Sequence, residues 1–200
     1  KCPLCRDSLP PGLDGLYNLG SRAYLRVRGR VDRGEMSWTS LPESEQEEMD
    51  NAVAVLTEAA AQGHMMAQAG LGDIYREGWG VAQDYARAFK FYSMAAQQGL
   101  AGAQFNLGNA YFNGEGCEQS YEQGVAWYTK AAKQGLAAAQ FNLGNAYRDG
   151  RGCYQSYEQA LAWYTKAAQQ GHADAQANLG YAYAKGFGVT QSIAKARRYY

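Results

Sequence analysis

The chain has 200 residues, with 19 lysines and arginines against 19 aspartates and glutamates, so its net charge is close to zero. This balance argues against a general nucleic-acid binder, a class that usually shows a basic excess. No run approaches the roughly 18 consecutive apolar residues of a membrane-spanning helix, so no membrane span is expected.

Residues 1–12 form the first segment and contain a Cys-x-x-Cys pair, Cys2 and Cys5, with the spacing of half a zinc site. The string C-P-L-C-R resembles the last ligand pair of a RING-type zinc finger. The chain begins with Lys1 rather than methionine, so we expect the other ligands of such a finger to lie upstream. Two ligands alone should not hold zinc tightly, and no other cofactor is expected. The alternative is two cysteines in a disordered tail; a redox pair is disfavoured because no βαβ pattern surrounds them.

Residues 13–63 are predicted to form an atypical N-terminal helical hairpin. Apolar residues over 13–30 have helical spacing, 34–41 has the composition of a loop, and a second helix begins near 43 with acids in its first turn. Arginines cluster in the first half, at Arg22, Arg26, Arg28, Arg30 and Arg33. We interpret this cluster as a solvated helix face balanced by the acidic stretch 43–50, with a phosphate or acidic-peptide contact as the alternative.

From His64 onward the sequence repeats every 36 residues, and each unit is closed by an equivalent glycine, such as Gly135 or Gly171. Residues 100–135 and 136–171 are near copies. Residues 64–99 form a more distant copy, and 172–200 a truncated one. A fixed period of this length indicates a repeat architecture, in which neighbouring units bury one another's apolar faces.

Each unit is predicted to be a helical hairpin. In its first half alanine, leucine and tyrosine recur at four-residue spacing, as in Ala103, Leu107 and Tyr111, which places them on one side of a helix. Paired glycines end that helix, and a serine such as Ser120 caps the next. The glycine after the leucine costs about 1 kcal/mol in a helix. We therefore expect it to allow close approach of the second helix, whose alanines are small. The predicted fold is all-α, a right-handed superhelical α/α solenoid of helical hairpins.

The unit 136–171 carries a recognisable set of residues at fixed spacing: Leu143, Gly144, Tyr147, Gly150, Gly152, Tyr157, Ala160, Trp163, Tyr164, Lys166, Ala167, Ala168 and Gly171. This pattern resembles the Sel1-like repeat, a longer relative of the tetratricopeptide repeat. The unit departs from it at Cys153 and Ser156, where the family usually has valine and aspartate, and the unit 64–99 has Phe91 for the tryptophan. The resemblance covers residues 64–200 and implies an adaptor that binds other proteins.

No motif for catalysis is present, so an enzyme is not expected. The two histidines, His64 and His172, occupy one repeat position, which Leu100 and Leu136 fill in the other units. That equivalence indicates a structural position rather than a catalytic base. The Gly-x-Gly pairs follow no strand, so a dinucleotide site is not supported.

Cys117 and Cys153 occupy a repeat position that is valine in the flanking units, at Val81 and Val189. They are therefore predicted to be small buried hydrophobic residues. Equivalent positions in stacked units lie about 9–10 Å apart. A disulfide needs Cα atoms within about 7 Å, so none is expected. Free thiols fit an intracellular, cytoplasmic location.

Three functions fit the sequence. The first is a scaffold that binds a protein or peptide on the concave face of the solenoid. The second is the substrate-recognition part of a RING-type ubiquitin ligase whose finger lies mostly upstream of Lys1, and the third is a structural spacer. Because the last unit stops near the middle of its second helix, we also expect Tyr199 and Tyr200 to be partly exposed and that end to self-associate.

In tetratricopeptide-like solenoids the first helix of each unit lines the concave side, and the resemblance implies groove residues around its leucine and after its tyrosine. Those positions are Asp73, Arg76, Glu77, Phe105, Asn109, Phe112, Asn113, Phe141, Asn145, Arg148, Asp149, Tyr181 and Lys185. The asparagines at 109 and 145 would hydrogen-bond an extended peptide. The three phenylalanines would be apolar anchors, and Arg76, Arg148 and Lys185 would select acidic or C-terminal groups. In the alternative interpretation Phe105 and Phe141 pack between units and bind nothing.

Overall fold

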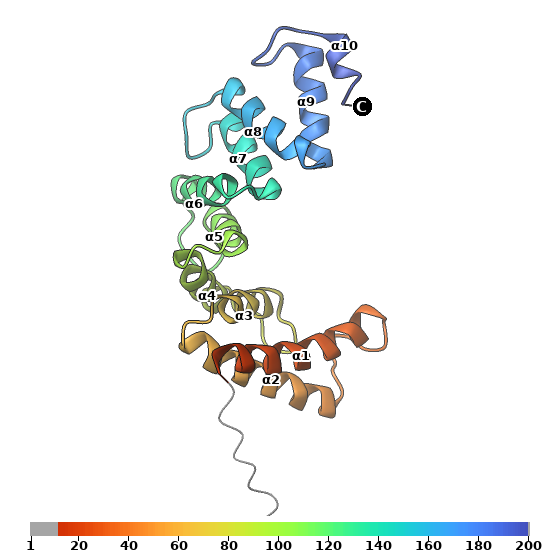
Figure 1. The fold of residues 1–200 in the computed structure, drawn as a ribbon, viewed down its shortest axis with the longest axis vertical. Helices are drawn as coiled ribbons and strands as arrows, with labels where there is room; N and C mark the ends of the chain where they lie inside the picture. The colour runs from red at the N-terminus through yellow and green to blue at the C-terminus, as the bar shows by residue number, and fades with distance from the viewer. Residues whose placement is uncertain (1–11, 200) are drawn as a thin grey trace, which may run out of the picture. The chain divides into compact units, whose positions relative to one another are not determined.

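The protein is described here by a computed structural model covering residues 12–199, which is almost entirely helical (Figure 1). Within that range it has no β-strand, only an isolated bridge between Ser37 and Ser40. The helices are α1 Leu13–Asp32, α2 Glu43–Ala61, α3 Met65–Glu77, α4 Tyr85–Gln97, α5 Ala101–Asn113, α6 Tyr121–Lys133, α7 Ala137–Asp149, α8 Tyr157–Gln169, α9 Ala173–Lys185 and α10 Ile193–Ala196. The predicted all-α solenoid of helical hairpins is confirmed. No helix in this range is long and apolar enough to cross a membrane.

The chain forms two compact units, one ending at Ala95 and the other beginning at Ala96. In the first unit, a core cluster includes the fully buried Leu56, Leu71 and Ile74 from α2 and α3. In the second unit, one cluster includes Tyr128 and Leu143, and a further one is built in the same way a repeat later. The apolar positions of the repeat therefore build each core, as the four-residue spacing predicts.

The arginine cluster of α1 is largely matched by acids. Arg26 pairs with Glu48 at 2.6 Å, and Arg30 pairs with both Glu35 and Glu45. These pairs are solvent-exposed on the arginine side, so each adds little stability. They neutralise much of the local charge, which supports the interpretation of this surface as a solvated helix face.

The caps and turns of the repeat follow the sequence closely. The Ser156 hydroxyl accepts a hydrogen bond from the Gln159 backbone N–H at 3.2 Å, which caps α8. Gly150 ends α7 at φ 68°, and Gly152 follows at φ 71°, both in the left-handed region that favours glycine. A Cβ on Gly152 would lie 2.3 Å from the carbonyl carbon of Tyr121. The second glycine therefore also lets the turn of one repeat lie against the start of α6 in the repeat before.

The glycine inside each first helix does allow close approach of the second helix, but the partner differs from the prediction. A Cβ on Gly144 would lie 2.6 Å from Cε1 of Tyr164, and one on Gly108 would lie 2.5 Å from Cδ1 of Tyr128. The space is therefore filled by a tyrosine ring and not by the small alanines. Alanines are buried nearby, but the tyrosine is the larger side chain and takes the position facing the glycine.

Buried glutamines are a feature that the sequence analysis missed. Gln104 and Gln140 are each 5% exposed, and each donates Nε2 to a backbone carbonyl eight residues earlier, at 3.2 Å. Their Oε1 atoms accept from Gln134 and Gln170, respectively, both at 2.8 Å. Each glutamine thereby satisfies a carbonyl near the end of the preceding helix. Because both of its own amide atoms are hydrogen-bonded as well, burying the side chain carries little desolvation cost.

The cysteine and C-terminal predictions are met in part. Cys117 and Cys153 are free thiols, but both are half-buried rather than buried. The Cys117 thiol contacts the Ala110 carbonyl of α5, and the Cys153 thiol contacts the Arg151 carbonyl of the turn. Tyr199 is half-buried and stacks on Tyr183 with ring centroids 5.9 Å apart. Cys2, Cys5 and Tyr200 lie outside the described residues.

Candidate functional site

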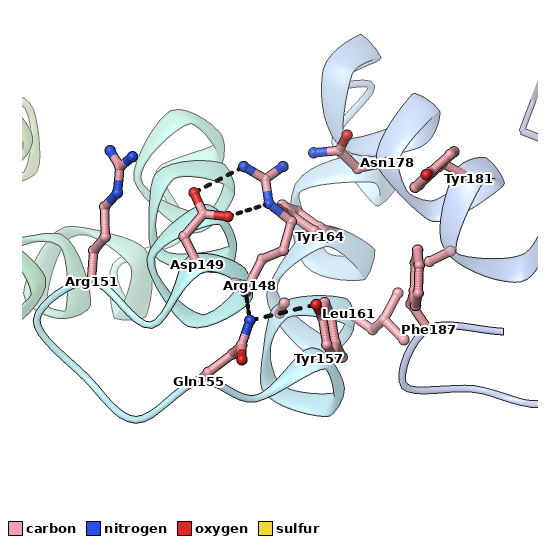
Figure 2. A pocket seen from close by; sticks show the side chains of 12 residues that line it. Arg148, Asp149, Arg151, Gln155, Tyr157, Leu161, Tyr164, Asn178, Tyr181 and Phe187 are labelled. Atoms are coloured by element: carbon pink, nitrogen blue, oxygen red, sulfur yellow. Dashed lines mark hydrogen bonds and ion pairs between the residues drawn. The ribbon is translucent and has the colours of Figure 1, made fainter. Parts of the chain in front are cut away.

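The second unit contains two neighbouring cavities on its helical repeats. The first, here called the polar cavity, has a volume of about 460 Å³ and is lined by Asn109, Phe112, Asn113, Tyr128, Asn142, Asn145, Ala146, Arg148, Asp149 and Arg151. The second, the aromatic cavity, has a volume of about 560 Å³ and is shown in Figure 2. Its lining is Arg148, Asp149, Arg151, Gln155, Tyr157, Ala160, Leu161, Tyr164, Asn178, Tyr181, Ala182 and Phe187.

The two cavities are the same site repeated. Shifting the polar cavity by one 36-residue repeat carries Tyr128 onto Tyr164, Asn142 onto Asn178 and Ala146 onto Ala182. The shift also carries Asn145 onto Tyr181. Three residues, Arg148, Asp149 and Arg151, line both cavities. The repeat therefore produces a continuous pair of subsites, with a charged group of side chains between them.

A tyrosine–asparagine pair connects the two helices beside each cavity. The Tyr128 hydroxyl donates to Asn109 Oδ1 at 2.6 Å, and the Tyr164 hydroxyl donates to Asn145 Oδ1 at the same distance. Burial raises the pKa of both tyrosines to about 12, so both hydroxyls remain protonated donors at neutral pH. The Oδ1 atoms of the two asparagines are thus used within the fold. Their Nδ2 groups have no hydrogen-bond partner within residues 12–199.

The charged group between the cavities carries one net positive charge. Arg148 makes two hydrogen bonds to the Asp149 carboxylate, at 2.7 and 3.0 Å. These bonds lower the pKa of Asp149 and raise that of Arg148, so both side chains are ionised. The guanidinium of Arg151 lies 5.9 Å from the ring centroid of Tyr121 and has no ion pair in the described part of the chain. Arg151 therefore supplies the excess charge.

The far wall of the aromatic cavity is apolar. Phe187 stacks on Tyr157 with ring centroids 5.4 Å apart and lies 5.8 Å from the ring of Tyr181. These three rings are 41%, 40% and 52% exposed, respectively, and Leu161 lies with them in the lining. Figure 2 shows Phe187, Tyr181 and Leu161 on one side and the Arg148–Asp149 pair on the other. One cavity thus combines an apolar surface with a cationic rim.

Seven of the residues proposed from sequence as groove positions line these cavities: Asn109, Phe112, Asn113, Asn145, Arg148, Asp149 and Tyr181. Phe112 also has a structural role, because its ring fills the space that a Cβ on Gly124 would occupy, with Cδ2 at 2.2 Å from that position. Asn113 donates to Glu115 at 2.9 Å at the exposed end of α5.

The other proposed contacts lie elsewhere. Phe105 packs on Tyr128 at 5.9 Å, and Phe141 packs on Tyr164 at 5.8 Å and stacks on His172 at 4.6 Å. They line neither cavity, because their position in the helix directs them to the ring that faces the glycine. Lys185 is exposed but lies outside both linings, and Arg76 lies in the first unit, paired with Glu77 at 2.7 Å.

The most informative residues that the sequence analysis missed are Arg151 and Phe187. Both are the middle residue of a Gly-x-Gly turn, which was interpreted from sequence only as a helix stop. The available signal was that the flanking glycines repeat while the residue between them changes in every unit, through Trp79, Glu115, Arg151 and Phe187.

Neither histidine lies at these cavities. The Nδ1 of His64 accepts from the Ala67 backbone N–H at 3.1 Å, which makes it a helix cap, and His172 is the stacking partner of Phe141. Residues 12–199 contain no cluster of three or more His, Cys, Asp or Glu side chains that could hold a metal ion.

Comparison with known proteins identifies the family. The Sel1 repeat model matches residues 66–100, 101–136, 137–172 and 173–200, which is more than half of the chain, so the protein belongs to the Sel1 repeat family. Sel1 repeats generally act as non-enzymatic scaffolds for interactions between proteins. Comparison with curated proteins gives no match.

Solved structures agree with this assignment. A protective antigen of uropathogenic Escherichia coli strains, described as displaying an SLR fold, is 34% identical over 94% of this chain, with a TM-score of 0.80. A Sel1 repeat protein from Oxalobacter formigenes is 38% identical over 74%, with a TM-score of 0.70. A Sel1 repeat protein of Klebsiella pneumoniae, 18% identical over 94% of this chain and 88% of its own, shares the fold at a TM-score of 0.53. The chain spans 37% of the first protein and 61% of the second, less than two thirds of either.

Proposed function

We propose that the protein is an interaction scaffold that binds an extended segment of a partner protein across the polar and aromatic cavities of its second unit. The observation that carries this proposal is that the two cavities are equivalent, adjacent and share the Arg148–Asp149–Arg151 group. A site repeated along the helices suits a ligand that also repeats along its length. An extended peptide is such a ligand, since its backbone groups recur at a fixed rise.

The polar groups of the site fit this ligand. The Nδ2 groups of Asn109 and Asn145 are donors that occur once per repeat, and a peptide backbone offers acceptor carbonyls along its length. Stacked repeats place equivalent groups about 9–10 Å apart. An extended chain covers that distance in about three residues. One asparagine in each repeat can therefore meet every third residue or so of the bound segment.

The repeat itself suggests the variant that tests this. Asp73 is the first-unit equivalent of the two asparagines, and its Oδ1 accepts from the Tyr92 hydroxyl at 2.7 Å. Replacing Asn109→Asp and Asn145→Asp together keeps the acceptor for each tyrosine while removing the Nδ2 donor. The matched control is Ala126→Ser with Ala162→Ser, at exposed positions of α6 and α8 outside both linings.

The measurement uses a displayed library of random peptides of about twelve residues, long enough to span both cavities. Peptides enriched on the whole chain are synthesised, and their affinity is measured by fluorescence anisotropy. We expect the asparagine variant to lose about tenfold or more in affinity, because peptide carbonyls would face carboxylates instead of donors. The serine control should bind like the parent. Unchanged affinity in a folded asparagine variant would contradict the proposed groove.

A further inference from the structure

We propose that the middle residue of each Gly-x-Gly turn determines what the groove selects. Arg151 would select an acidic side chain, and Phe187 a bulky apolar or aromatic one about three residues away on the same bound segment. This inference rests on the proposed function, since it names the chemistry of the peptide that the same groove would bind.

The backbone of the turn is held in the same way in each repeat, so that only the side chain changes. The Arg151 N–H donates to the Ala146 carbonyl at 3.0 Å, and the Phe187 N–H donates to the Ala182 carbonyl at 3.1 Å. The flanking glycines hold left-handed φ angles, from 68° to 78° in these two turns. Such a turn is a defined helix ending with little freedom. Each turn therefore presents its middle side chain from a fixed point.

That fixed point lies at a cavity. Arg151 lines the polar cavity at the position that Phe187 takes in the aromatic cavity one repeat later. The exchange replaces a cation by an aromatic ring at equivalent places, while Tyr128 and Tyr164 behind them stay the same. The turn backbone and the tyrosine behind it stay the same, so the turn residue is one of the side chains that make the two subsites chemically different. The others are the changes from Phe112 to Arg148, Asn113 to Asp149 and Asn145 to Tyr181.

The charge at Arg151 fits an anionic group on the ligand. Arg148 beside it already binds the Asp149 carboxylate through two hydrogen bonds, which neutralises both. Arg151 is exposed and has no ion pair within residues 12–199, and a guanidinium in this state binds carboxylates well. Because the three side chains together carry one net positive charge, the site favours one such carboxylate.

The first unit shows an aromatic ring seated on this turn position. Trp79 is its equivalent there, and Trp38, from the segment between α1 and α2, packs against it with ring centroids 6.1 Å apart. Tyr24 of α1 completes the cluster at 5.9 Å from Trp79. In the first unit the chain itself thus supplies a ring to the turn residue. Phe187 also contacts two rings of the chain, Tyr157 and Tyr181, but it remains 41% exposed, so a partner's ring can pack on its open surface.

The test uses the same displayed library on the whole chain, selected in parallel on three variants. We expect parent-selected peptides to contain an acidic residue and a bulky apolar residue about three positions apart. Arg151→Glu should replace the acidic preference by a basic one. It should also weaken the parent's peptides about tenfold. Phe187→Arg, which copies the residue of the preceding repeat, should replace the apolar preference by a second acidic one.

The matched control is Tyr154→Ala. Tyr154 is 97% exposed, lies close to Arg151 in sequence and lines neither cavity, so its variant should select the parent's motif. Circular dichroism and urea midpoints check that all variants fold. Peptides that need Asn109 and Asn145 but keep their motif in both turn variants would overturn this inference and leave the proposed function standing. No enriched peptide, or peptides indifferent to the asparagine variant, would overturn both.

Discussion

Alanine substitution at two glycines of α5 should change the stability of the fold in opposite directions. Gly102 and Gly108 lie in the same 13-residue helix, and helix propensity alone favours alanine at either site by about 1 kcal/mol. The structure shows that the surroundings of the two glycines differ. A Cβ on Gly102 would have nothing within 4 Å, whereas one on Gly108 would lie 2.5 Å from Cδ1 of Tyr128. Alanine already occupies the position equivalent to Gly102 in the next repeat, at Ala138.

The cost at Gly108 follows from how the tyrosine is held. Carbon atoms pack best at about 3.5–4.0 Å, so the ring would have to move by about 1 Å. Tyr128 is only 3% exposed and its hydroxyl is bonded to Asn109, so it has little room to move. Overpacking of this kind costs about 1–3 kcal/mol, more than the propensity gain. We expect Gly102→Ala to stabilise by up to about 1 kcal/mol. Gly108→Ala should destabilise by up to about 2 kcal/mol once the propensity gain is subtracted from the overpacking cost.

Urea unfolding of the whole chain, followed by circular dichroism and by tryptophan fluorescence, measures the difference. A gap of about 2 kcal/mol moves the midpoint by roughly 1 M, given typical slopes. Repeat proteins can unfold in steps, so the two signals must coincide before free energies are compared. A Gly108→Ala protein as stable as the Gly102→Ala protein would refute the assignment of Tyr128 as the reason for the glycine.

Two further variants exchange residues between repeats. Burial raises the pKa of Asp73 in the fold, because it disfavours the charged carboxylate. The protonated side chain therefore favours the folded state at low pH, and this contribution is lost as pH rises through the raised pKa. Asp73→Asn keeps the acceptor for Tyr92 and should raise the urea midpoint at about pH 7, by an amount that shrinks at about pH 3; an equal gain at both would contradict this. Gly124→Ala should destabilise by about 1–3 kcal/mol through its clash with Phe112. Adding Phe112→Arg reproduces the combination of the next repeat, where Ala160 and Arg148 occupy these two positions, and should recover most of that loss in a double-mutant cycle. Additive effects of the two substitutions would exclude the coupling.

The sequence was sufficient to predict the hairpins, their caps and their period. Those features depend on local rules, such as Ser156 capping α8 or Gly150 ending α7, and a repeat shows each rule several times. The role of the histidine position also followed, because leucine replaces it in two units. Local rules and internal repetition therefore gave the fold without knowledge of any long-range contact.

The packing partners could not be predicted in the same way. The pairing of Gly144 with Tyr164 depends on how the two helices of a hairpin cross, which side-chain spacing within one helix does not fix. For the same reason the sequence left open whether Phe141 is a groove anchor or a packing residue, and only the structure shows its contact with Tyr164. Gln140 was overlooked because a polar residue is usually exposed, and only the structure shows the carbonyl that it satisfies.

The two near-identical repeats show where the chain has been varied. Residues 100–135 and 136–171 differ at eight positions, and five of these place a residue in the lining of the polar or the aromatic cavity. Those five pairs are Phe112 and Arg148, Asn113 and Asp149, Glu115 and Arg151, Gly124 and Ala160, and Val125 and Leu161. The glycine–tyrosine contact, the buried glutamines and the caps are the same in both. Side chains that support the stack are therefore the same in both repeats, and most of the differences fall at the cavities, beside lining residues such as Asn109 and Asn145 that do not differ. This is the division expected of a scaffold whose repeats contact different parts of one ligand through a shared frame.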